Sequence, residues 1–223
     1  MAARDEGLGI KVLIADDHAL MREGLRSILT REDGIEITGE ACSGLEVLEL
    51  CLEAVPDIVV MDVAMEDLNG VEATRRLRER HASVRVIALS SHNDSRLMAE
   101  MLRAGASGYV LKENAYTELR RAMDAVSRGS TYLCPGAAGK AAEIIQDTEA
   151  PRGSAWDVLG DREREVLQLL AEGLTSAEIA GKLHIAPNTV ETHRRNIMRK
   201  LDLHNVVELT RYAIREGLTR VDD

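Results

Sequence analysis

The chain has 223 residues, a formal net charge of −10 and 45% hydrophobic residues, which is enough for one large domain or, more in keeping with this length, two smaller ones. The charge does not suit an obligate nucleic-acid protein, no apolar stretch approaches membrane-spanning length, and the N-terminus lacks the order of a secretory signal, so we expect a cytoplasmic protein without a membrane partner. The scattered cysteines, Cys42, Cys51 and Cys134, lack metal-ligand spacing and favour reduced packing residues.

The first 130 residues alternate apolar runs with helical patterns. The segments between the runs carry the 3.6-residue period, as residues 20–29 do, and a further helix is predicted over 116–128. Regular alternation of this kind predicts a doubly wound α/β fold, in which helices cover both faces of a five-stranded parallel sheet. The predicted strands are residues 10–15, 35–41, 57–61, 84–89 and 108–111.

The third of these runs, residues 57–62, is strongly apolar and ends in the carboxylate of Asp62. It is typical of a buried parallel strand, and open α/β folds place their ligands beyond the carboxyl ends of such strands. A single aspartate at this point is also typical of a helix cap. The residues after the other strands favour a site, because Asp16 and Asp17 follow the first, Ser90 the fourth and Lys112 the fifth.

Three neighbouring carboxylates repel one another unless a cation joins them, and oxygen ligands suit Mg²⁺ better than a softer metal. A lysine and a hydroxyl beside that metal complete a site for a small phosphoryl group. Each position alone has a plainer interpretation: Asp16 and Asp17 as helix caps, Lys112 as a solvated loop residue and Tyr109 as core.

Four motifs in order resemble the receiver domain of two-component response regulators over residues 10 to about 130: Ile-Ala-Asp16-Asp17-His, Val-Val-Met-Asp62, Ala-Leu-Ser90-Ser and Gly-Tyr109-Val-Leu-Lys112. The resemblance implies a flavodoxin-like sheet of order 2-1-3-4-5 and a Mg²⁺ cofactor. It also implies these roles: Asp62 as phosphoacceptor, Asp17 as a direct metal ligand with Asp16 as its partner, the Ala64 carbonyl as a further ligand, Ser90 and Lys112 as holders of the phosphoryl oxygens, and Tyr109 as the aromatic switch.

Two details of the sequence after Asp62 bear on its function. One departs from the usual receiver motif, and the other distinguishes a receiver from a phosphatase. Receivers commonly carry Met-Pro where this chain has Met65-Glu66, so we expect altered loop stiffness or dephosphorylation rate. Haloacid-dehalogenase phosphatases also form a phosphoaspartate, but they need an aspartate two residues later as general acid, and this chain has Ala64 there. We therefore do not expect an enzyme.

The composition changes after the last predicted helix of this region. Residues 133–154 are bounded by Pro and Gly and have an alanine-rich middle, which indicates a linker with a short helix over 137–146. The predicted boundaries are 8–132 for the receiver, 133–154 for the linker and 155–219 for a second domain.

The C-terminal segment predicts a small all-α domain of four helices. Asp161 can cap the first, Thr175 opens the second through a capping box, Pro187 suits the first turn of the third, and Asn205 caps the last before Gly217. Two short helices joined by the turn at 184–186 suggest a helix-turn-helix.

The third helix separates an apolar side, formed by Val190, Ile197 and Leu201, from a polar one. Residues 192–201 hold four basic residues and no acid, although 155–223 total 10 basic and 12 acidic residues. Leu159 to Gly217 resembles the LuxR-type helix-turn-helix, with Asp-Arg-Glu-Arg-Glu-Val-Leu, Thr189-Val-Glu191-Thr192-His-Arg194 and Asn-Ile-Met-Arg199-Lys200-Leu in order. That resemblance implies DNA contacts by Asn188, Thr189, Glu191, Thr192, Arg194, Arg195, Arg199 and Lys200.

Together the two resemblances indicate the NarL/FixJ class of response regulators. They imply a transcription factor that a sensor histidine kinase phosphorylates, that forms a homodimer on double-stranded operator DNA, and that has RNA polymerase as a possible partner. Two alternatives stay open: a receiver that regulates other proteins without binding DNA, and a DNA binder that needs no phosphorylation.

The charge distribution adds a hypothesis about regulation. Residues 1–134 hold 16 basic and 23 acidic residues, so the linker could let this acidic receiver fold back over Arg194, Arg195 and Arg199. Residue Ala186 stands where the LuxR-type pattern usually has Ser or Thr, which removes an N-cap worth about 0.5 to 2 kcal/mol.

Overall fold

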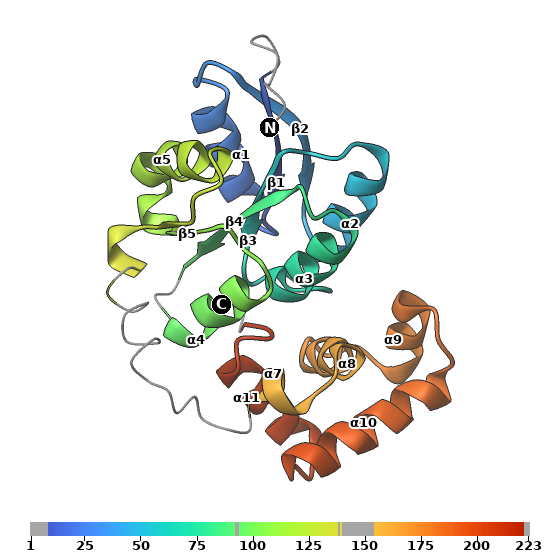
Figure 1. The fold of residues 1–223 in the computed structure, drawn as a ribbon. Coiled ribbons are helices and arrows are strands. Elements are labelled where there is room, and N and C mark those ends of the chain that lie inside the picture. Colours follow the sequence, from blue (N-terminus) through green and yellow to red (C-terminus); the bar gives the residue numbers. More distant parts are fainter. Residues whose placement is uncertain (1–8, 92–93, 138, 140–153, 221–223) are drawn as a thin grey trace.

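The computed structural model describes residues 9–91, 94–137, 139 and 154–220. They form an α/β domain, residues 9–137, followed by a helical domain, residues 154–220 (Figure 1). The elements of the α/β domain are β1 (Ile10–Ala15), α1 (Ala19–Leu29), β2 (Ile35–Ala41), α2 (Gly44–Glu53), β3 (Ile58–Asp62), α3 (Gly70–Arg80), β4 (Arg85–Ser90), α4 (Ser95–Arg103), β5 (Gly108–Leu111), the 3-10 turn η1 (Lys112–Asn114), α5 (Ala115–Ser127) and β6 (Tyr132–Leu133).

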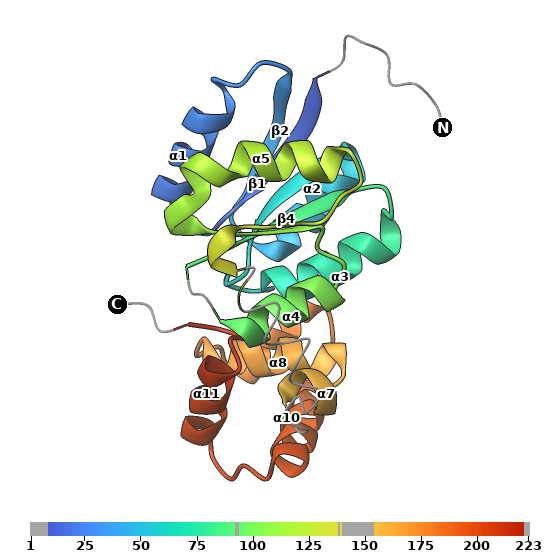
Figure 2. The ribbon, with the colours of Figure 1, turned by 60° about the vertical axis from the view of Figure 1, so that its left-hand side comes forward.

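The sheet is parallel throughout and has the order β2-β1-β3-β4-β5-β6. Its first five strands confirm the predicted order. All residues of β3 are buried, because this strand lies inside the sheet and helices cover both faces. In Figures 1 and 2, α1 and α5 lie on one face, and α2, α3 and α4 lie on the other.

The sixth strand is a correction to the five-stranded prediction. Gly129 has a φ of 81°, so the chain turns after α5 and returns to the open edge of β5. There Tyr132 lies opposite Gly108, and the Cys134 N–H donates to the Tyr109 carbonyl over 3.0 Å. Two residues are too few to give a period, so the pattern of the sequence does not reveal this strand.

Cys134 and Ala137 are fully buried, so the first residues of the predicted linker pack on the α/β domain. The short helix predicted over 137–146 lies almost wholly outside the described residues. The domain boundaries at 132 and 155 stay predictions.

The helical domain contains α7 (Ala155–Val158), α8 (Asp161–Ala171), α9 (Ser176–Leu183), α10 (Pro187–Leu201) and α11 (Val206–Arg215). The four predicted helices are present, and α7 adds one turn before them. Thr175 and Glu178 form the predicted capping box, and the Asn205 side chain caps α11. Asp161 is not the cap of α8, because Gly160 occupies that position and Asp161 forms an ion pair with Arg164.

The two domains are packed against each other, with the helical domain beside α3 and α4 (Figures 1 and 2). One contiguous group of buried apolar side chains runs from the sheet face under these helices into the helical domain; it includes Met61, Leu77, Met98, Trp156, Val166 and Leu218. The other face of the sheet has a separate core under α1 and α5. Among the described helices, none combines the length and the apolar character that a membrane crossing requires.

Candidate functional site

Three carboxylates meet at the carboxyl edge of the sheet, as the strand ends predict. Asp16 and Asp17 follow β1, Asp62 ends β3, and ligand oxygens of the three lie within 4.8 Å of one another. The two strands are neighbours in register, with Ala15 opposite Met61, so their ends come together. Asp16 is 0% and Asp62 is 2% exposed, which means that these charges depend on close cationic partners.

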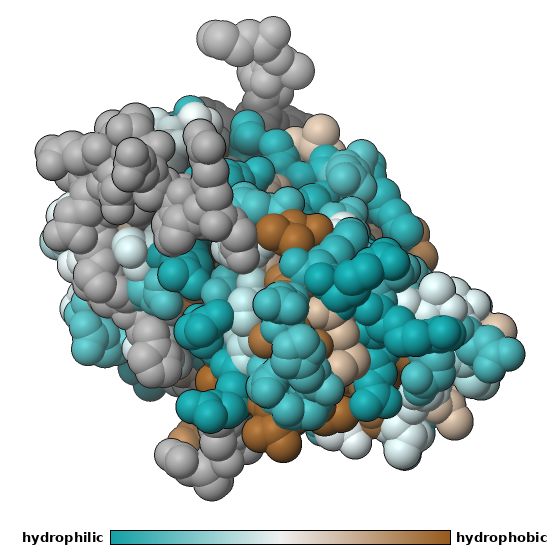
Figure 3. Space-filling model, turned by 90° about the horizontal axis from the view of Figure 1, so that it is seen from below, coloured by the Kyte–Doolittle hydropathy of each residue, from teal (hydrophilic) through white to brown (hydrophobic). Residues whose placement is uncertain are grey.

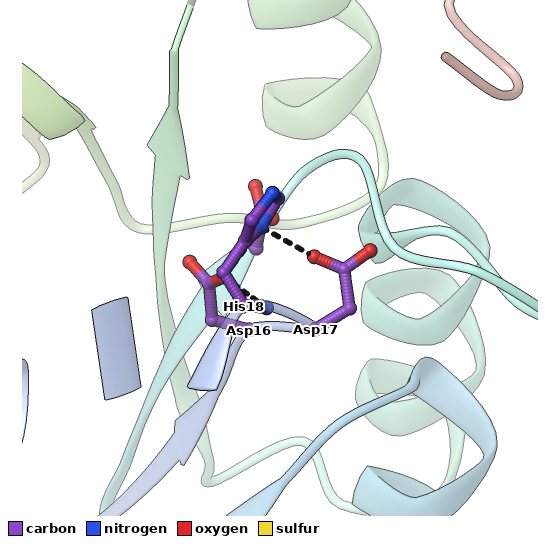
Figure 4. A group of neighbouring side chains, drawn as sticks. Asp16, Asp17 and His18 are labelled. Atoms are coloured by element: carbon purple, nitrogen blue, oxygen red, sulfur yellow. Dashed lines mark hydrogen bonds and ion pairs between the residues drawn. The ribbon is translucent and has the colours of Figure 1, made fainter. Parts of the chain in front are cut away.

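His18 belongs to the same group, although the sequence pattern assigns no role to it. Its Nδ1 lies 2.8 Å from Asp17 Oδ1 and 3.3 Å from Asp16 Oδ1, with the ring turned towards both carboxylates (Figure 4). Its backbone N–H also donates to Asp16 Oδ1 over 2.9 Å. The side chain is 54% exposed. A histidine just after an aspartate pair is the only sequence signal for this contact.

Lys112 is the cation that the sequence predicts for this edge. Its Nζ lies 2.7 Å from Asp16 Oδ2 and 2.8 Å from Asp62 Oδ2. The residue begins η1 directly after β5, and its side chain is 13% exposed. The ammonium group therefore bridges two buried carboxylates that come from different strands.

Burial, together with the neighbouring charge of Asp16, raises the pKa of Asp62 to about 6, although the Lys112 ammonium opposes the shift. The Ala64 N–H also donates to Asp62 Oδ1 over 3.3 Å. Asp62 is consequently a carboxyl group whose ionised form depends on added positive charge nearby.

Ser90 and Tyr109 are brought together as a pair. Ser90 ends β4 and is 4% exposed, while Tyr109 lies in β5 and is fully buried. Burial raises the pKa of Tyr109 to about 12, and its hydrogen bond with Ser90 opposes that shift. The predicted hydroxyl residue and the predicted aromatic switch are therefore in direct contact.

The loop after Asp62, residues 63–69, closes one side of the site. Ala64, whose carbonyl is the predicted fourth metal ligand, lines a pocket together with Asp17 and Met65. The loop turns tightly into α3 because Gly70 has no side chain: a Cβ there would collide with the Asp62 carbonyl oxygen. The same pocket is lined from the helical domain by Ala171, Glu172 and Arg220.

The helical domain holds this loop through Gln168 of α8. Gln168 is fully buried; its Nε2 donates to the Met65 carbonyl over 2.9 Å, and its Oε1 accepts from the Asn69 side-chain amide over 2.9 Å. Lys182 of α9 also forms an ion pair with Asp67 at 2.6 Å. Sequence reasoning misses Gln168, and a polar residue within the apolar run 166–170 is the only signal that could have found it.

A buried ion pair joins the domains behind the loop. The Arg164 guanidinium of α8 donates to Glu72 of α3, and the two side chains are 4% and 1% exposed. Arg164 also lies over the Trp156 ring, 5.5 Å from its centroid. Because a buried charge is costly unless it is paired, this contact ties α3 to α8.

Glu172 makes the contact between domains sensitive to pH. Burial, together with the charges of Asp67 and Glu66, raises its pKa to about 7, although its hydrogen bonds to Gln168 and the Asp67 N–H oppose the shift. Docking favours the protonated group, so it is strongest below the ordinary pKa of 4.5 and weakens as the pH rises through about 7.

We therefore expect docking to be weaker at about pH 8 than at about pH 6, and we expect Glu172→Gln to flatten this dependence. Hydrogen exchange of the Asp67 amide, which donates to Glu172 over 3.3 Å, measures the effect. An equally steep dependence in the variant would contradict the assignment to Glu172.

Helix α10 presents the predicted polar face to solvent. Val190 and Ile197 are buried against the domain, whereas Thr192, Arg195 and Arg199 are exposed. Of the other predicted DNA contacts, Asn188, Thr189 and Lys200 are exposed, and Glu191 and Arg194 are partly buried. Ala186 makes no side-chain cap at the start of the helix, as expected. Viewed from the end of the molecule where α10 and α11 lie, the surface is largely hydrophilic, with smaller hydrophobic areas (Figure 3).

Several of these side chains have partners inside the helical domain. Within α10 itself, Arg195 Nε donates to the Glu191 carbonyl over 3.3 Å and Arg199 Nη2 donates to Asn196 Oδ1 over 3.0 Å. The Ser176 hydroxyl donates to Glu191, and Lys200 Nζ lies 2.6 Å from Glu163 Oε2. Lys200 would have to leave Glu163 to contact a phosphate, whereas Arg195 and Arg199 project from the exposed face.

The hypothesis that the acidic receiver covers α10 is wrong for this structure. The described contacts between the domains come from α8, α9 and residues 216–220, while α10 packs on α7, α8 and α9. Arg195 and Arg199 remain exposed. The domains dock through complementary buried groups such as Arg164 and Glu72, which a sum of charges over a whole domain does not reveal.

Comparison with known families agrees with this geometry. The model of the response regulator receiver domain matches residues 12–124, and the model of the bacterial regulatory proteins of the luxR family matches residues 157–213. The chain is 36% identical to the response regulator UvrY of Escherichia coli, over 96% of this chain and 97% of that protein. It is 34% identical to the response regulator protein VraR of Staphylococcus aureus, over 94% of this chain and 98% of that protein.

The fold is also similar to that of the two-component response regulator RcsB in its complex with DNA. That likeness has a TM-score of 0.59 and 25% sequence identity, and it covers 92% of this chain and 97% of RcsB.

Proposed function

This chain belongs to the response regulators that join a receiver domain to a LuxR-type DNA-binding domain, and from that premise we propose that phosphorylation of Asp62 controls how it regulates transcription. The observation that carries the proposal is the group formed by Asp16, Asp17, Asp62 and Lys112 at one edge of the sheet. Asp62 is the member that ends the central strand β3.

The proposed reaction is a phosphoryl transfer from a sensor histidine kinase. An Asp62 carboxylate oxygen attacks the phosphorus of the kinase phosphohistidine, an O–P bond forms as the P–N bond breaks, and the imidazole leaves with the electron pair of that bond. The neighbouring Lys112 ammonium, 2.8 Å from Asp62, supports this role because it favours the ionised and nucleophilic carboxylate.

The residues present fit a Mg²⁺ site. Carboxylates of Asp16, Asp17 and Asp62 with the Ala64 carbonyl would form an all-oxygen set, which is what this ion prefers. When bound, Mg²⁺ neutralises the negative charge of the carboxylates and of the phosphoryl group.

Lys112, Ser90 and Tyr109 are proposed to respond to the phosphoryl group. After transfer, the Lys112 ammonium would bind a phosphoryl oxygen instead of the Asp62 carboxylate. The Ser90 hydroxyl would bind another oxygen and give up its hydrogen bond with Tyr109. The Tyr109 ring, which is fully buried in the resting chain, would then change its packing against α4.

The loop at 63–69 is the proposed link to the second domain. It begins directly after the phosphoacceptor, and Gln168, Glu172 and Lys182 of the helical domain bind it. A shift of Ala64 towards a bound metal would strain the bonds to Met65 and Asn69. Phosphorylation and domain docking are therefore expected to favour different positions of this loop.

On DNA, α10 is proposed to enter the major groove. Arg195 would read guanine and Glu191 would accept from cytosine; Asn188 and Thr192 would lie at the bases, and Thr189, Arg194, Arg199 and Lys200 would meet phosphates. Exposure of Arg195 and Arg199 in the resting chain supports this role over a domain that no longer binds DNA.

Arg195→Ala is expected to cost about 1 to 3 kcal/mol on the preferred DNA site and to lower sequence preference, since a bidentate contact to guanine is lost. The matched control is Arg199→Ala, which removes the same charge from the same exposed face and should weaken all sequences alike. Fluorescence anisotropy on the selected and a scrambled site, at one salt concentration, measures both. Equal losses on the two DNAs for Arg195→Ala would remove its base-reading role.

The partners that follow are a sensor histidine kinase, double-stranded DNA, a second copy of the chain and RNA polymerase, and the proposed setting is the cytoplasm. We propose no enzymatic activity beyond acceptance of the phosphoryl group, because Ala64 stands where a phosphatase of the haloacid-dehalogenase type carries its general acid.

One experiment separates this proposal from its rivals. A DNA site is selected from a random pool with the full chain treated with acetyl phosphate and Mg²⁺, and its affinity is measured with and without that treatment. The proposal predicts tighter binding after treatment and no effect of treatment in EDTA. Equal affinity in all conditions would favour phosphorylation-independent binding, and failure to select any site would favour a regulator that acts on proteins.

A further inference from the structure

Arg220 of the helical domain reaches into the acidic site of the receiver. Its Nη2 lies 2.7 Å from Asp17 Oδ2, and its Nη1 lies 4.0 Å from Asp62 Oδ2. The same Nη2 is 3.3 Å from Nδ1 of His18. A guanidinium from the end of the helical domain thus spans two of the three carboxylates, although 203 positions separate Arg220 from Asp17.

The segment that delivers Arg220, residues 216–220, is anchored on the receiver and is here called the tail segment. Arg96 of α4 donates to Glu216 Oε1 over 3.0 Å. Gly217 has a φ of 70° and packs against Leu97, so closely that an added Cβ would lie 2.6 Å from a methyl carbon of that leucine. Leu218 is fully buried, and its N–H donates to the Ala213 carbonyl.

These contacts fix the direction of the chain just before Arg220. The path depends on glycine at 217, because other residues rarely adopt a positive φ and a side chain there would collide with α4. The packing of Gly217 against α4 and the burial of Leu218 therefore direct Arg220 into the site.

The position of the guanidinium conflicts with that of a metal ion. An ion that binds both Asp17 and Asp62 must lie between their oxygens, at about 2.0 to 2.1 Å from each for Mg²⁺. Arg220 is a cation that already faces both carboxylates, with Nη2 2.7 Å from Asp17 Oδ2 and Nη1 4.0 Å from Asp62 Oδ2, so its guanidinium and such an ion would compete for the same oxygens. With Lys112 as the other close cation, either arginine or metal can offset the remaining negative charge.

We propose that the Arg220 guanidinium takes the place of the metal ion at the carboxylates of the resting chain. The binding of a divalent cation and the docking of the tail segment therefore exclude each other. The inference rests on the proposed Mg²⁺ site and adds the regulation of that site. In the resting chain, Arg220 neutralises Asp17 and holds the tail segment against α4. Entry of the cation displaces Arg220, and the contacts of Glu216, Gly217 and Leu218 lose their anchor.

Thermodynamic linkage makes the effect reciprocal. Docking of the tail segment lowers the affinity for the cation by the same factor by which bound cation lowers the equilibrium constant for docking. If the tail is docked for about 90% of the time, removal of Arg220 raises the apparent affinity about tenfold, because only the undocked fraction binds.

The test uses Mn²⁺, whose electron paramagnetic resonance signal reports free and bound ion without any phosphorylation. The full-length wild type, Arg220→Ala and Arg211→Ala are titrated at one salt concentration. Arg211 is the matched control, because it is an exposed arginine on α11 outside the site. We expect Arg220→Ala to bind Mn²⁺ about tenfold more tightly than the wild type, and Arg211→Ala to match the wild type.

Hydrogen exchange gives the reciprocal readout. The Leu218 amide, which donates to Ala213, should exchange faster with Mn²⁺ than with EDTA in the wild type, and fast in both conditions in Arg220→Ala. Equal Mn²⁺ affinity in the wild type and Arg220→Ala, or an equal gain in both arginine variants, overturns the inference. Asp17→Asn separates the two levels of the account: if it binds Mn²⁺ as the wild type does, the proposed metal site itself fails.

Discussion

Asp62→Asn is expected to lower phosphorylation by acetyl phosphate and Mg²⁺ to below about 1% of the wild-type level, because an amide oxygen is a far weaker nucleophile than a carboxylate. Asp62 is the proposed acceptor among the grouped carboxylates because it is the one that ends the central strand β3; Lys112 lies 2.8 Å from it and 2.7 Å from Asp16. Intact-mass measurement of the phosphoryl adduct follows the reaction.

The matched control for this change is Asp33→Asn, which removes one carboxylate from an exposed position outside the site and should leave the reaction unchanged. EDTA should also abolish the adduct in the wild type. If Asp62→Asn gains the adduct at the wild-type rate, another carboxylate is the acceptor, and the assignment of the site is wrong.

The second large effect is expected at the contact between the domains. Glu72→Gln removes the buried counter-charge of the Arg164 guanidinium, which is 4% exposed, and leaves it with the exposed carboxylate of Asp161. Removal of one partner of a buried ion pair typically costs about 3 to 5 kcal/mol, so docking should weaken by more than about 100-fold. Energy transfer between one dye on each domain measures the docked fraction.

Two controls separate this effect from a general loss of charge. The double variant Glu72→Leu with Arg164→Met replaces both partners by apolar groups and should recover much of the docking. Glu32→Gln removes one partner of an exposed ion pair with Arg120 and should change stability by less than about 1 kcal/mol. Docking in Glu72→Gln as strong as in the wild type would show that this pair does not hold the domains together.

The parts of the site that the sequence predicts all follow from local patterns of residues along the chain. Each strand of the site is an apolar run of a few residues whose end is visible in the sequence, so residue order is enough to place Asp16, Asp62 and Lys112 at one sheet edge. The four main helices of the second domain are equally visible, because Thr175, Pro187 and Asn205 mark helix starts by known capping chemistry. These features depend on neighbours a few positions away.

The parts that escape prediction depend on residues far apart. Gln168 meets Asn69 across 99 positions, and Arg220 meets Asp17 across 203, so no period or spacing connects them. The expected contact of the receiver with Arg195 is wrong for the same reason, since net charge gives no information about which surfaces fit. His18 shows that even a contact between neighbours in the sequence can escape prediction, because the rotamer of its side chain brings it to the carboxylates.

The loop at 63–69 and the tail segment are the two contacts between the domains through which we propose that the state of Asp62 reaches the helical domain. The loop is held by Gln168 and the tail by Arg220, and both contacts lie at the proposed metal and phosphoryl site. Release of the helical domain on phosphorylation is the central expectation.

Energy transfer within one chain tests that expectation most directly. Cys42 is exposed while Cys51 and Cys134 are buried, so one dye can be placed on the receiver at Cys42 and the other at His204→Cys, an exposed position on the helical domain. Excess unlabelled chain suppresses transfer between the two copies of a dimer. The account predicts efficient transfer in the resting chain and a clear loss of transfer after treatment with acetyl phosphate and Mg²⁺, absent in Asp62→Asn. Unchanged transfer in a chain whose phosphorylation is verified by mass would contradict it.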